Sequence, residues 1–210
     1  SIVIRTLVAG FERLYAGRTD IIVGGDFFWY PVQGQPATVV AADAMVVVQV
    51  PHPLDIFTIG SYRQWEHGGH PAPAGEVLSP SNSRSERARK RRFYDQHGVD
   101  EYWVFDPQDG TLEVWVRSAT RLTEAADPAR GWVSPTTGVH VRVDGTELVV
   151  HDPDGIRRWL APAQEAARAD SEAARADSEA ARAEAASARA AALEAQLIEL
   201  RSQLGTDPAS

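Results

Sequence analysis

Two acidic residues, Asp43 and Glu76, each stand beside apolar residues that have the character of a buried strand. A buried carboxylate without a partner costs several kcal/mol, so each acid must accept backbone hydrogen bonds or meet a cation. Two carboxylates on neighbouring strands suit a hard divalent cation such as Mg²⁺, with a backbone carbonyl and waters completing the shell. Two interpretations of these acids stay open. Each is a structural carboxylate at a strand end, or the two together form a divalent-metal site.

Lys90 is the only lysine in the chain, against 20 arginines. In a sequence so biased toward arginine, a retained lysine points to a specific role, because its ammonium group is a compact charge with a shiftable pKa. Such a charge is useful beside an attacking water or a transferring phosphoryl group. Helical spacing puts Glu86, Lys90 and Tyr94 on one stripe, with an ion pair expected between the first two. This stripe is the candidate partner of the acids, and chance retention of one lysine is the alternative.

Basic residues surround this lysine, and Glu86 alone opposes them between residues 84 and 92. The arginines of the run are Arg84, Arg87, Arg89, Arg91 and Arg92. A run of this kind is either a solvated helix face or a surface that contacts phosphates.

The first half of the chain predicts one helix and two strands. Apolar positions at near-helical spacing in residues 2–16 predict an amphipathic helix that ends at Gly17. Residues 21–30 and 39–50 are rich in β-branched and aromatic residues and predict one strand each. Residues 51–75 are rich in proline and glycine and predict a long connection, which in a compact domain is more often functional than idle.

The second half predicts a strand, a helix and two hairpins. Residues 75–79 predict a short buried strand, and Ser83 or Ser85 is placed to cap a helix that runs to Gly98. The remaining predicted elements are strands at 101–107 and 112–117, a hairpin at 140–152 with its turn at Asp144 and Gly145, and a short closing helix at 155–160. Residues 1–160 are therefore expected to form one mixed α/β domain.

Residues 161–210 differ in kind from the rest. From Glu165 the unit EAARADS occurs twice and is followed by a degraded copy, which gives a seven-residue period. Leu193, Leu197, Leu200 and Leu204 continue with spacings of four, three and four residues. The pattern predicts a C-terminal alanine-rich coiled coil and self-association through the leucines, and a single alanine-rich helix is the alternative.

The bulk composition limits the classes of function. The net charge of −8 gives no long-range attraction to nucleic acid, so DNA binding would need a local positive patch. Cysteine is absent, which excludes disulfides and cysteine-ligated metals and favours a reducing compartment, with the cytoplasm expected. No apolar run reaches membrane-spanning length and no signal peptide opens the chain. Because helical sequence begins at Ser1, we expect that residues preceding it are missing.

Several of these segments together resemble the Uma2 family of restriction-endonuclease-like proteins, a branch of the PD-(D/E)xK nuclease superfamily. The segments are SYRQWEHGG, EVLSPSN with Glu86, Lys90 and Tyr94 after it, and GVDEYWVFDP. Before them, VVAADAMVVV resembles the family strand that bears the first acid. The resemblance extends in order and spacing from about residue 20 to 152, and a heptad tail is a frequent appendage in such proteins.

The resemblance implies a restriction-endonuclease-like mixed sheet flanked by helices and an Mg²⁺- or Mn²⁺-dependent endonuclease that cleaves DNA. Asp43 and Glu76 would be the metal-binding acids, with the backbone of Val77 as a further ligand and Lys90 as the catalytic lysine. Glu86 and Tyr94 would support them, and the basic run would contact DNA phosphates.

The sequence departs from the family pattern at two places. The superfamily lysine lies two residues after the second acid, where this chain has Leu78, so the lysine must have moved to the next helix as Lys90. Family members carry an apolar strand before the glutamate, but here Ala72, Pro73, Ala74 and Gly75 precede it. A catalytically inactive binding or assembly module that oligomerises through its tail is therefore kept as the alternative function.

Other candidate sites are weaker. His67 and His70 flank a Gly-Gly pair without a third histidine nearby, which is a poor zinc site. Tryptophans such as Trp103 and Trp115 are interpreted as packing residues rather than as platforms for base stacking. Paired acids also occur in glycoside hydrolases, but the lysine stripe argues against that class.

Overall fold

The computed structural model describes residues 1–204, which fall into two compact units that divide between Pro162 and Ala163. The first unit is built around a six-stranded sheet. Across the sheet its strands are β1 (Ile21–Gly24), β4 (Ala44–Val48), β6 (His70–Val77), β7 (Glu101–Asp106), β8 (Thr111–Ser118) and β9 (Arg121–Glu124). Only β6 and β7 pair in parallel, so the sheet is mixed.

Two small sheets and five short helical elements complete this unit. One small sheet joins β3 (Val40–Ala42), β2 (Phe27–Tyr30) and β5 (Ser61–Arg63), and the other joins β10 (Trp132–Val133), β11 (His140–Asp144) and β12 (Glu147–His151). The helical elements are α1 (Ile2–Leu14), α2 (Ile56–Ile59), α3 (Gln64–His67), α4 (Arg84–Gln96) and the 3-10 turn η1 (Pro128–Arg130).

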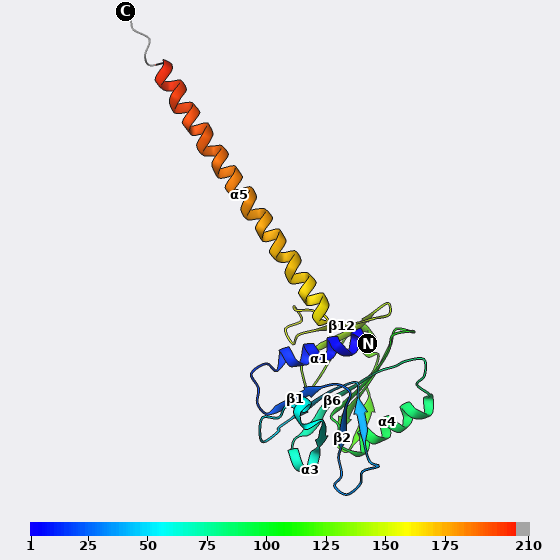
Figure 1. Ribbon diagram of the computed structural model, residues 1–210. Coiled ribbons are helices and arrows are strands. Elements are labelled where there is room, and N and C mark those ends of the chain that lie inside the picture. The colour runs from blue at the N-terminus through cyan, green and yellow to red at the C-terminus, as the bar shows by residue number, and fades with distance from the viewer. Residues whose placement is uncertain (205–210) are drawn as a thin grey trace, which may run out of the picture. The chain divides into compact units, whose positions relative to one another are not determined.

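The two faces of the central sheet carry separate hydrophobic cores, because successive residues of a strand point to opposite faces. On one face Met45, Tyr102 and Val104 pack with α4 and the β3-β2-β5 sheet. On the other face Val46 and Trp103 pack with α1 and the β10-β11-β12 sheet. Figure 1 shows α1 and α4 on opposite sides of the strands. The expected fold class, a mixed α/β sheet flanked by helices, is confirmed.

Helix α1 packs against Trp159, which lies near the C-terminal end of the first unit. Phe11 meets Trp159 edge-on with 4.9 Å between ring centroids, and Arg13 forms an ion pair with Asp152 at 2.7 Å. The indole nitrogen of Trp159 donates to the same aspartate at 2.6 Å. A Cβ at Gly10 would lie 2.0 Å from the Trp159 ring, so only glycine lets the ring pack this closely on the helix.

Both strands predicted in the first half of the chain are wrong in their extent, because each is split in two. Residues 21–30 turn at Gly25 and Asp26, and Asp26 has a positive φ of 56°. Residues 39–50 bend at Asp43, which separates β3 in the small sheet from β4 in the central sheet. Asp43 is therefore at a strand junction and not inside a strand.

The predicted connection over residues 51–75 is also wrong. It contains α2, β5, α3 and most of β6, which begins at His70 and not at Gly75. The prolines argued against a central strand, but the pairing register with β4 shifts between Met45 and Val47, opposite Pro71 and Ala74. A β-bulge of this kind leaves positions without a ladder bond, and such positions accommodate proline.

The later elements follow the prediction more closely. The hairpin of β7 and β8 and the hairpin of β11 and β12 are confirmed. Helix α4 begins after Ser83, whose hydroxyl accepts the Glu86 N–H at 3.2 Å, so of the two predicted caps Ser83 is the one used. The closing helix predicted at 155–160 is wrong, since Arg158 forms only an isolated bridge with His151.

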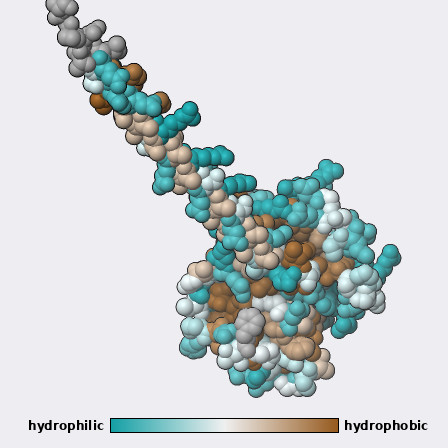
Figure 2. Space-filling model, turned by 45° about the horizontal axis from the view of Figure 1, so that its top comes forward, coloured by the Kyte–Doolittle hydropathy of each residue, from teal (hydrophilic) through white to brown (hydrophobic). Residues whose placement is uncertain are grey.

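The second unit consists of one long helix, α5 (Pro162–Leu204), whose first residue belongs to the first unit. Its leucines Leu193, Leu197 and Leu200 are 53%, 54% and 55% exposed, and the side chain of Leu204 lies outside the described part of the chain. Figure 2 shows hydrophobic surface gathered toward the C-terminal end of this helix. The helix is as expected, and its association into a coiled coil stays a prediction.

Within residues 1–204, no helix combines the length and the apolar character that crossing a membrane requires.

Candidate active site

The strand junction at Asp43 places its carboxylate against the end of β6. The Asp43 Oδ2 accepts a hydrogen bond from the backbone N–H of Val77 at 2.7 Å. The β1–β2 turn passes close behind, because a Cβ at Gly25 would lie 2.3 Å from the Asp43 carbonyl oxygen. Glycine at position 25 therefore lets the backbone approach that positions Asp43.

Glu76 precedes Val77 and is only 6% exposed. Its Oε2 accepts from the Lys90 Nζ at 2.7 Å, and its Oε1 accepts from the Tyr94 hydroxyl at 2.7 Å. The Lys90 Nζ also lies 3.5 Å from the carbonyl oxygen of Ala41, which is at the junction before Asp43. The structure thus brings Asp43, Glu76 and Lys90 together from three separate segments.

Helix α4 presents Lys90 and Tyr94 one turn apart, as the stripe predicted. Glu86 lies on the same stripe, but within residues 1–204 it forms no ion pair with Lys90. The expected Glu86–Lys90 pair is wrong because the ammonium group bonds to the buried Glu76 instead. Of the two supporting residues, Tyr94 therefore contacts Glu76, and Glu86 remains near the helix start.

Burial raises the pKa of Glu76 to about 7, against the lowering effects of the Lys90 charge and of the hydrogen bonds from Lys90 and Tyr94. The nearby Asp43 charge raises this pKa further. Desolvation costs the ionised form of a carboxyl group more than the neutral form, so the group ionises at higher pH. Glu76 is consequently a carboxyl group that changes charge near neutral pH.

Burial also raises the pKa of Asp43, while the Val77 N–H and the Lys90 charge lower it. The charge of Asp26 raises the pKa of Asp43 as well, which places a third carboxylate near the pair. The pKa of Tyr94 is raised well above its usual value by complete burial and by Glu76. Tyr94 therefore stays a neutral hydrogen-bond donor to the carboxylate.

The donor set suits a divalent cation with oxygen ligands. The N–H and C=O of one strand residue project to the same side, so the carbonyl of Val77 faces the side on which its N–H meets Asp43. Two carboxylates, one carbonyl and waters are the ligands that Mg²⁺ prefers. Residues 1–204 contain no group of three or more histidine, cysteine, aspartate or glutamate residues able to hold a metal, so such an ion would rely on the carbonyl and on water.

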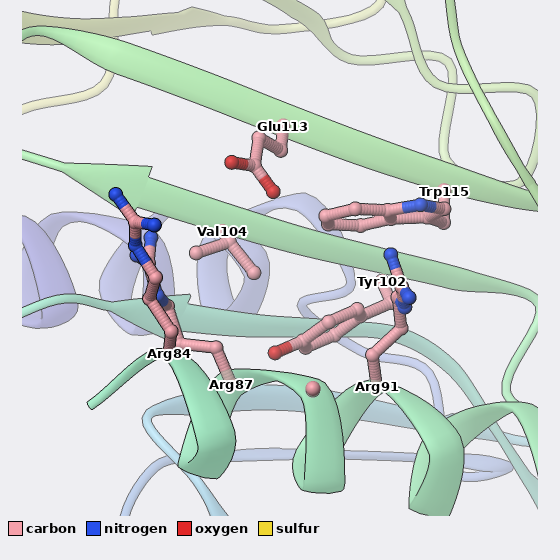
Figure 3. Close-up of a pocket in the computed structure, with 8 residues that line it drawn as sticks. Arg84, Arg87, Arg91, Tyr102, Val104, Glu113 and Trp115 are labelled. Atoms are coloured by element: carbon pink, nitrogen blue, oxygen red, sulfur yellow. The ribbon is translucent and has the colours of Figure 1, made fainter. Parts of the chain in front are cut away.

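The predicted DNA-binding arginines are divided between faces of α4. Arg84, Arg87 and Arg91 line a hollow between this helix and the strands β7 and β8 (Figure 3). Arg92 lines a second hollow that continues toward β9. Arg89 is exposed and lines neither hollow. The basic run is therefore partly a solvated face and partly the wall of a groove.

Sequence reasoning missed several residues around the site. Tyr102 packs on Tyr94 with 4.6 Å between ring centroids, and Trp115 stacks on Tyr102 at 5.5 Å. Glu113 lies on the same face of β8 as Trp115 and lines the hollow. Strand alternation together with the register of the β7–β8 hairpin could have placed these residues beside α4.

The weak zinc candidate has ordinary hydrogen-bonding roles. The His67 Nδ1 accepts from the backbone N–H of Arg63 at 3.0 Å, and the His70 Nε2 lies 2.9 Å from the Asp100 carboxylate. The two histidines thus contact different partners.

The first unit is thus a mixed α/β domain with a helix on each face of its sheet, and it gathers two acids and a lysine at a strand end. The Uma2 family, described as "Putative restriction endonuclease", matches residues 3–144. The chain belongs to this family, and the resemblance expected from the sequence is confirmed. The family description supports a nuclease function.

Among solved structures, the chain is similar to one titled "Crystal structure of a putative nuclease belonging to DUF820 from Anabaena variabilis ATCC 29413 at 1.96 A resolution". The two are 16% identical, the match covers 64% of this chain and 72% of that chain, and the TM-score is 0.46. No curated protein matches the chain.

Proposed function

We propose that the protein is an Mg²⁺- or Mn²⁺-dependent endonuclease that hydrolyses phosphodiester bonds of DNA. The observation that supports this most is the buried Glu76 carboxylate, which lies 2.7 Å from the Lys90 ammonium and directly before the residue that binds Asp43. Membership of a family described as "Putative restriction endonuclease" supports the same reaction class. The cytoplasmic location remains a prediction from the cysteine-free sequence.

In this proposal Asp43, Glu76 and the carbonyl of Val77 would hold the ion. The bound ion would activate a water molecule and neutralise charge on the scissile phosphate. Lys90 supplies a mobile positive charge that can donate to a phosphate oxygen while staying beside Glu76. Tyr94 fixes the orientation of the Glu76 carboxylate by donating to its Oε1.

The direct test is nicking of supercoiled plasmid DNA by the purified full chain. We expect nicking that depends on Mg²⁺ or Mn²⁺, stops with EDTA, and falls at least about 100-fold in Asp43→Asn, because the amide keeps the size but loses the charge that binds the ion. Asp109→Asn is the matched control, since Asp109 lies in the exposed β7–β8 turn. Equal nicking by both variants would mean that the cleavage comes from another site of the protein or from a contaminant.

The raised pKa of Glu76 makes metal binding dependent on pH. The ion needs the ionised carboxylate, so its affinity should rise by about tenfold between pH 6 and pH 8 and level off above the Glu76 pKa of about 7. Mn²⁺ titration followed by calorimetry at several pH values measures this change. Glu76→Gln should remove both the binding and its pH dependence.

The same shift affects stability with a defined sign. The pKa of Glu76 in the folded chain, about 7, is above its ordinary value of 4.5, so between these values the folded state binds more protons than the unfolded state. The contribution of Glu76 to stability is therefore full below pH 4.5 and is lost as the pH rises through 7. The unfolding free energy of Glu76→Gln should fall less across this window than that of wild type, and equal slopes in the two proteins would contradict the assignment.

The exposed leucines of α5 favour a second function, assembly through the tail. Leu193, Leu197 and Leu200 repeat with the spacing of a coiled-coil seam and are more than half exposed. We propose that they pair with a second copy of the chain. If so, Leu197→Ala with Leu200→Ala should shift the sedimenting species to the monomer, whereas Ile198→Ala, an equally apolar change off the seam, should not. A monomeric wild-type chain would exclude this assembly.

A further inference from the structure

A hollow of about 190 Å³ lies between α4 and the central sheet. Arg84, Arg87 and Arg91 line it from the helix, while Tyr102, Glu113 and Trp115 line it from β7 and β8. Figure 3 shows Arg84 and Arg87 at one end and Arg91 with Trp115 at the other. Charged groups and aromatic rings therefore line one small space.

The hollow is a continuation of the acid–lysine site across the sheet. Glu76 pairs with Val104, and Val104 pairs with Glu113, so Glu76 and Glu113 lie in one row on one face. Neighbouring strands are about 4.8 Å apart, which puts Glu113 about 10 Å from Glu76. Tyr102 joins the two places, because it packs on Tyr94, the donor to Glu76. A nucleotide adjoining one bound at Glu76 can reach the hollow.

The arginines of the hollow are available to bind an anion. Arg84, Arg87 and Arg91 share one face of α4 because they recur at three and four residues. Within residues 1–204 none of them forms an ion pair, although Arg91 lies 5.3 Å above the centroid of the Trp115 ring. Three unpaired guanidinium groups on one wall favour a phosphate there.

The inner wall favours a base over a second phosphate. The Glu113 carboxylate would repel a phosphate but can accept a hydrogen bond from the amino group of cytosine. Trp115 offers an aromatic face that Arg91 now covers, and Arg91 is exposed and can be displaced. Aromatic side chains beside a basic groove are the usual partners of unpaired bases. The lining thus has separate places for the phosphate and the base of one nucleotide.

A second hollow extends the first. Arg91 and Trp115 line both, and the second, of about 330 Å³, adds Arg92 and Arg121 along β9. A chain of nucleotides leaving the first hollow would meet these two arginines and also the carboxyl groups of Asp95 and Glu124.

We propose that the first hollow binds one unpaired nucleotide of the DNA strand beside the scissile phosphate. Its phosphate contacts Arg84 and Arg87, its base lies against Trp115 in the place now taken by Arg91, and its exocyclic amino group donates to Glu113. The preferred substrate is then single-stranded or locally unpaired DNA. This inference rests on the proposed function in taking DNA as the ligand.

The test measures binding without cleavage. The full chain in EDTA is titrated into a labelled twelve-nucleotide strand and into the same strand as a duplex, and anisotropy gives the dissociation constants. We expect the single strand to bind at least tenfold more tightly. Arg84→Ala with Arg87→Ala should weaken this binding at least tenfold and lower the salt slope by about 0.7, the value for one lost phosphate contact. The double variant Arg5→Ala with Arg89→Ala, which removes two exposed arginines that line neither hollow, is the matched control.

Base recognition separates this proposal from a general attraction of basic residues. Oligo-dC should bind about tenfold more tightly than oligo-dT, because thymine carries a carbonyl oxygen where cytosine carries an amino group. Glu113→Gln should abolish that preference, since glutamine can donate as well as accept. Trp115→Leu should weaken binding of both strands about five- to 100-fold, and circular dichroism checks that this core variant folds.

Some results would overturn the proposal. These results are equal affinity for the duplex and the single strand, an equal loss of affinity in the two double variants, or an unchanged preference for oligo-dC in Glu113→Gln. The nicking assay reports separately on the proposed function. Binding with the expected pattern but without nicking would reject the nuclease and keep the nucleotide site, whereas nicking with binding independent of the hollow would reject the nucleotide site alone.

Discussion

Lys90→Ala is expected to reduce the rate of DNA nicking at least about 100-fold, the cost of removing one well-placed charge stabiliser. Within residues 1–204, Lys90 is the only cationic group bonded to Glu76, and its Nζ lies 2.7 Å from Oε2. Its charge lowers the pKa of Glu76, so its removal raises that pKa above the present value of about 7. The variant loses the ammonium group and also the ionised carboxylate that would hold the ion near neutral pH.

Initial rates of plasmid nicking from pH 6 to pH 9 measure this effect. The residual activity of Lys90→Ala should rise over a higher pH range than wild-type activity, a displacement that a purely structural role of Lys90 would not produce. Arg89→Ala is the matched control, because it removes a neighbouring positive charge that does not contact Glu76. A variant that keeps more than a tenth of the wild-type rate at pH 8 would show that the lysine has no part in the reaction.

Glu101→Ala is expected to destabilise the protein by about 3–5 kcal/mol, the range for removing one partner from a buried charged network. Glu101 is fully buried at the start of β7. Its carboxylate accepts from the Trp103 indole at 2.9 Å, from the Ser134 hydroxyl at 2.8 Å, and from the backbone N–H and hydroxyl of Thr136 at 2.8 and 2.6 Å. Alanine would leave these donors without an acceptor. The segment of Ser134 and Thr136, which precedes β11, would lose its hydrogen bonds to Glu101 of β7.

Urea titration measures the free energy of unfolding from the midpoint and from the slope m of each variant. Glu124→Ala, an exposed acid on β9, serves as the control and should change stability by less than about 0.5 kcal/mol. Glu101→Gln should cost less than Glu101→Ala, because the amide oxygen still accepts from some of the donors. Equal stabilities of Glu101→Ala and Glu124→Ala would mean that the network contributes nothing net.

The placement of the acid–lysine group was predictable because its members are chemically conspicuous. A lone lysine among arginines and acids beside apolar runs can be recognised without a structure, and the stripe of Lys90 and Tyr94 follows from helical spacing. The roles of these residues in metal binding and catalysis remain predictions. The heptad period likewise predicted the helix of the tail but says nothing of its partner.

The errors arose where tertiary contacts override local preference. Proline argued against a strand before Glu76, but the bulge opposite β4 removes the need for a ladder bond there. The bend at Asp43 depends on the approach of Gly25, a contact across 18 residues that no local pattern shows. Glu101 was not singled out because Ser134 and Thr136, which donate to it, lie more than 30 residues away.

The hollow beside α4 could not be found from composition, because it depends on which strands pair. Glu113 and Trp115 become neighbours of the arginines only when β8 aligns with β7 in the observed register. A register slip by one residue would turn both side chains to the α1 face.

The packing of Trp159 on Gly10 determines how a mechanical load on the C-terminus would enter the first unit. Trp159 and Ala161 are both buried and immediately precede the long helix, so tension applied through α5 is borne first by the indole ring and α1. Helix α1 covers the face of the sheet opposite to Lys90 and Glu76. Tethering the protein by its C-terminus therefore strains the face of the sheet opposite to Glu76 and Lys90, and the strain reaches these two residues only through the strands.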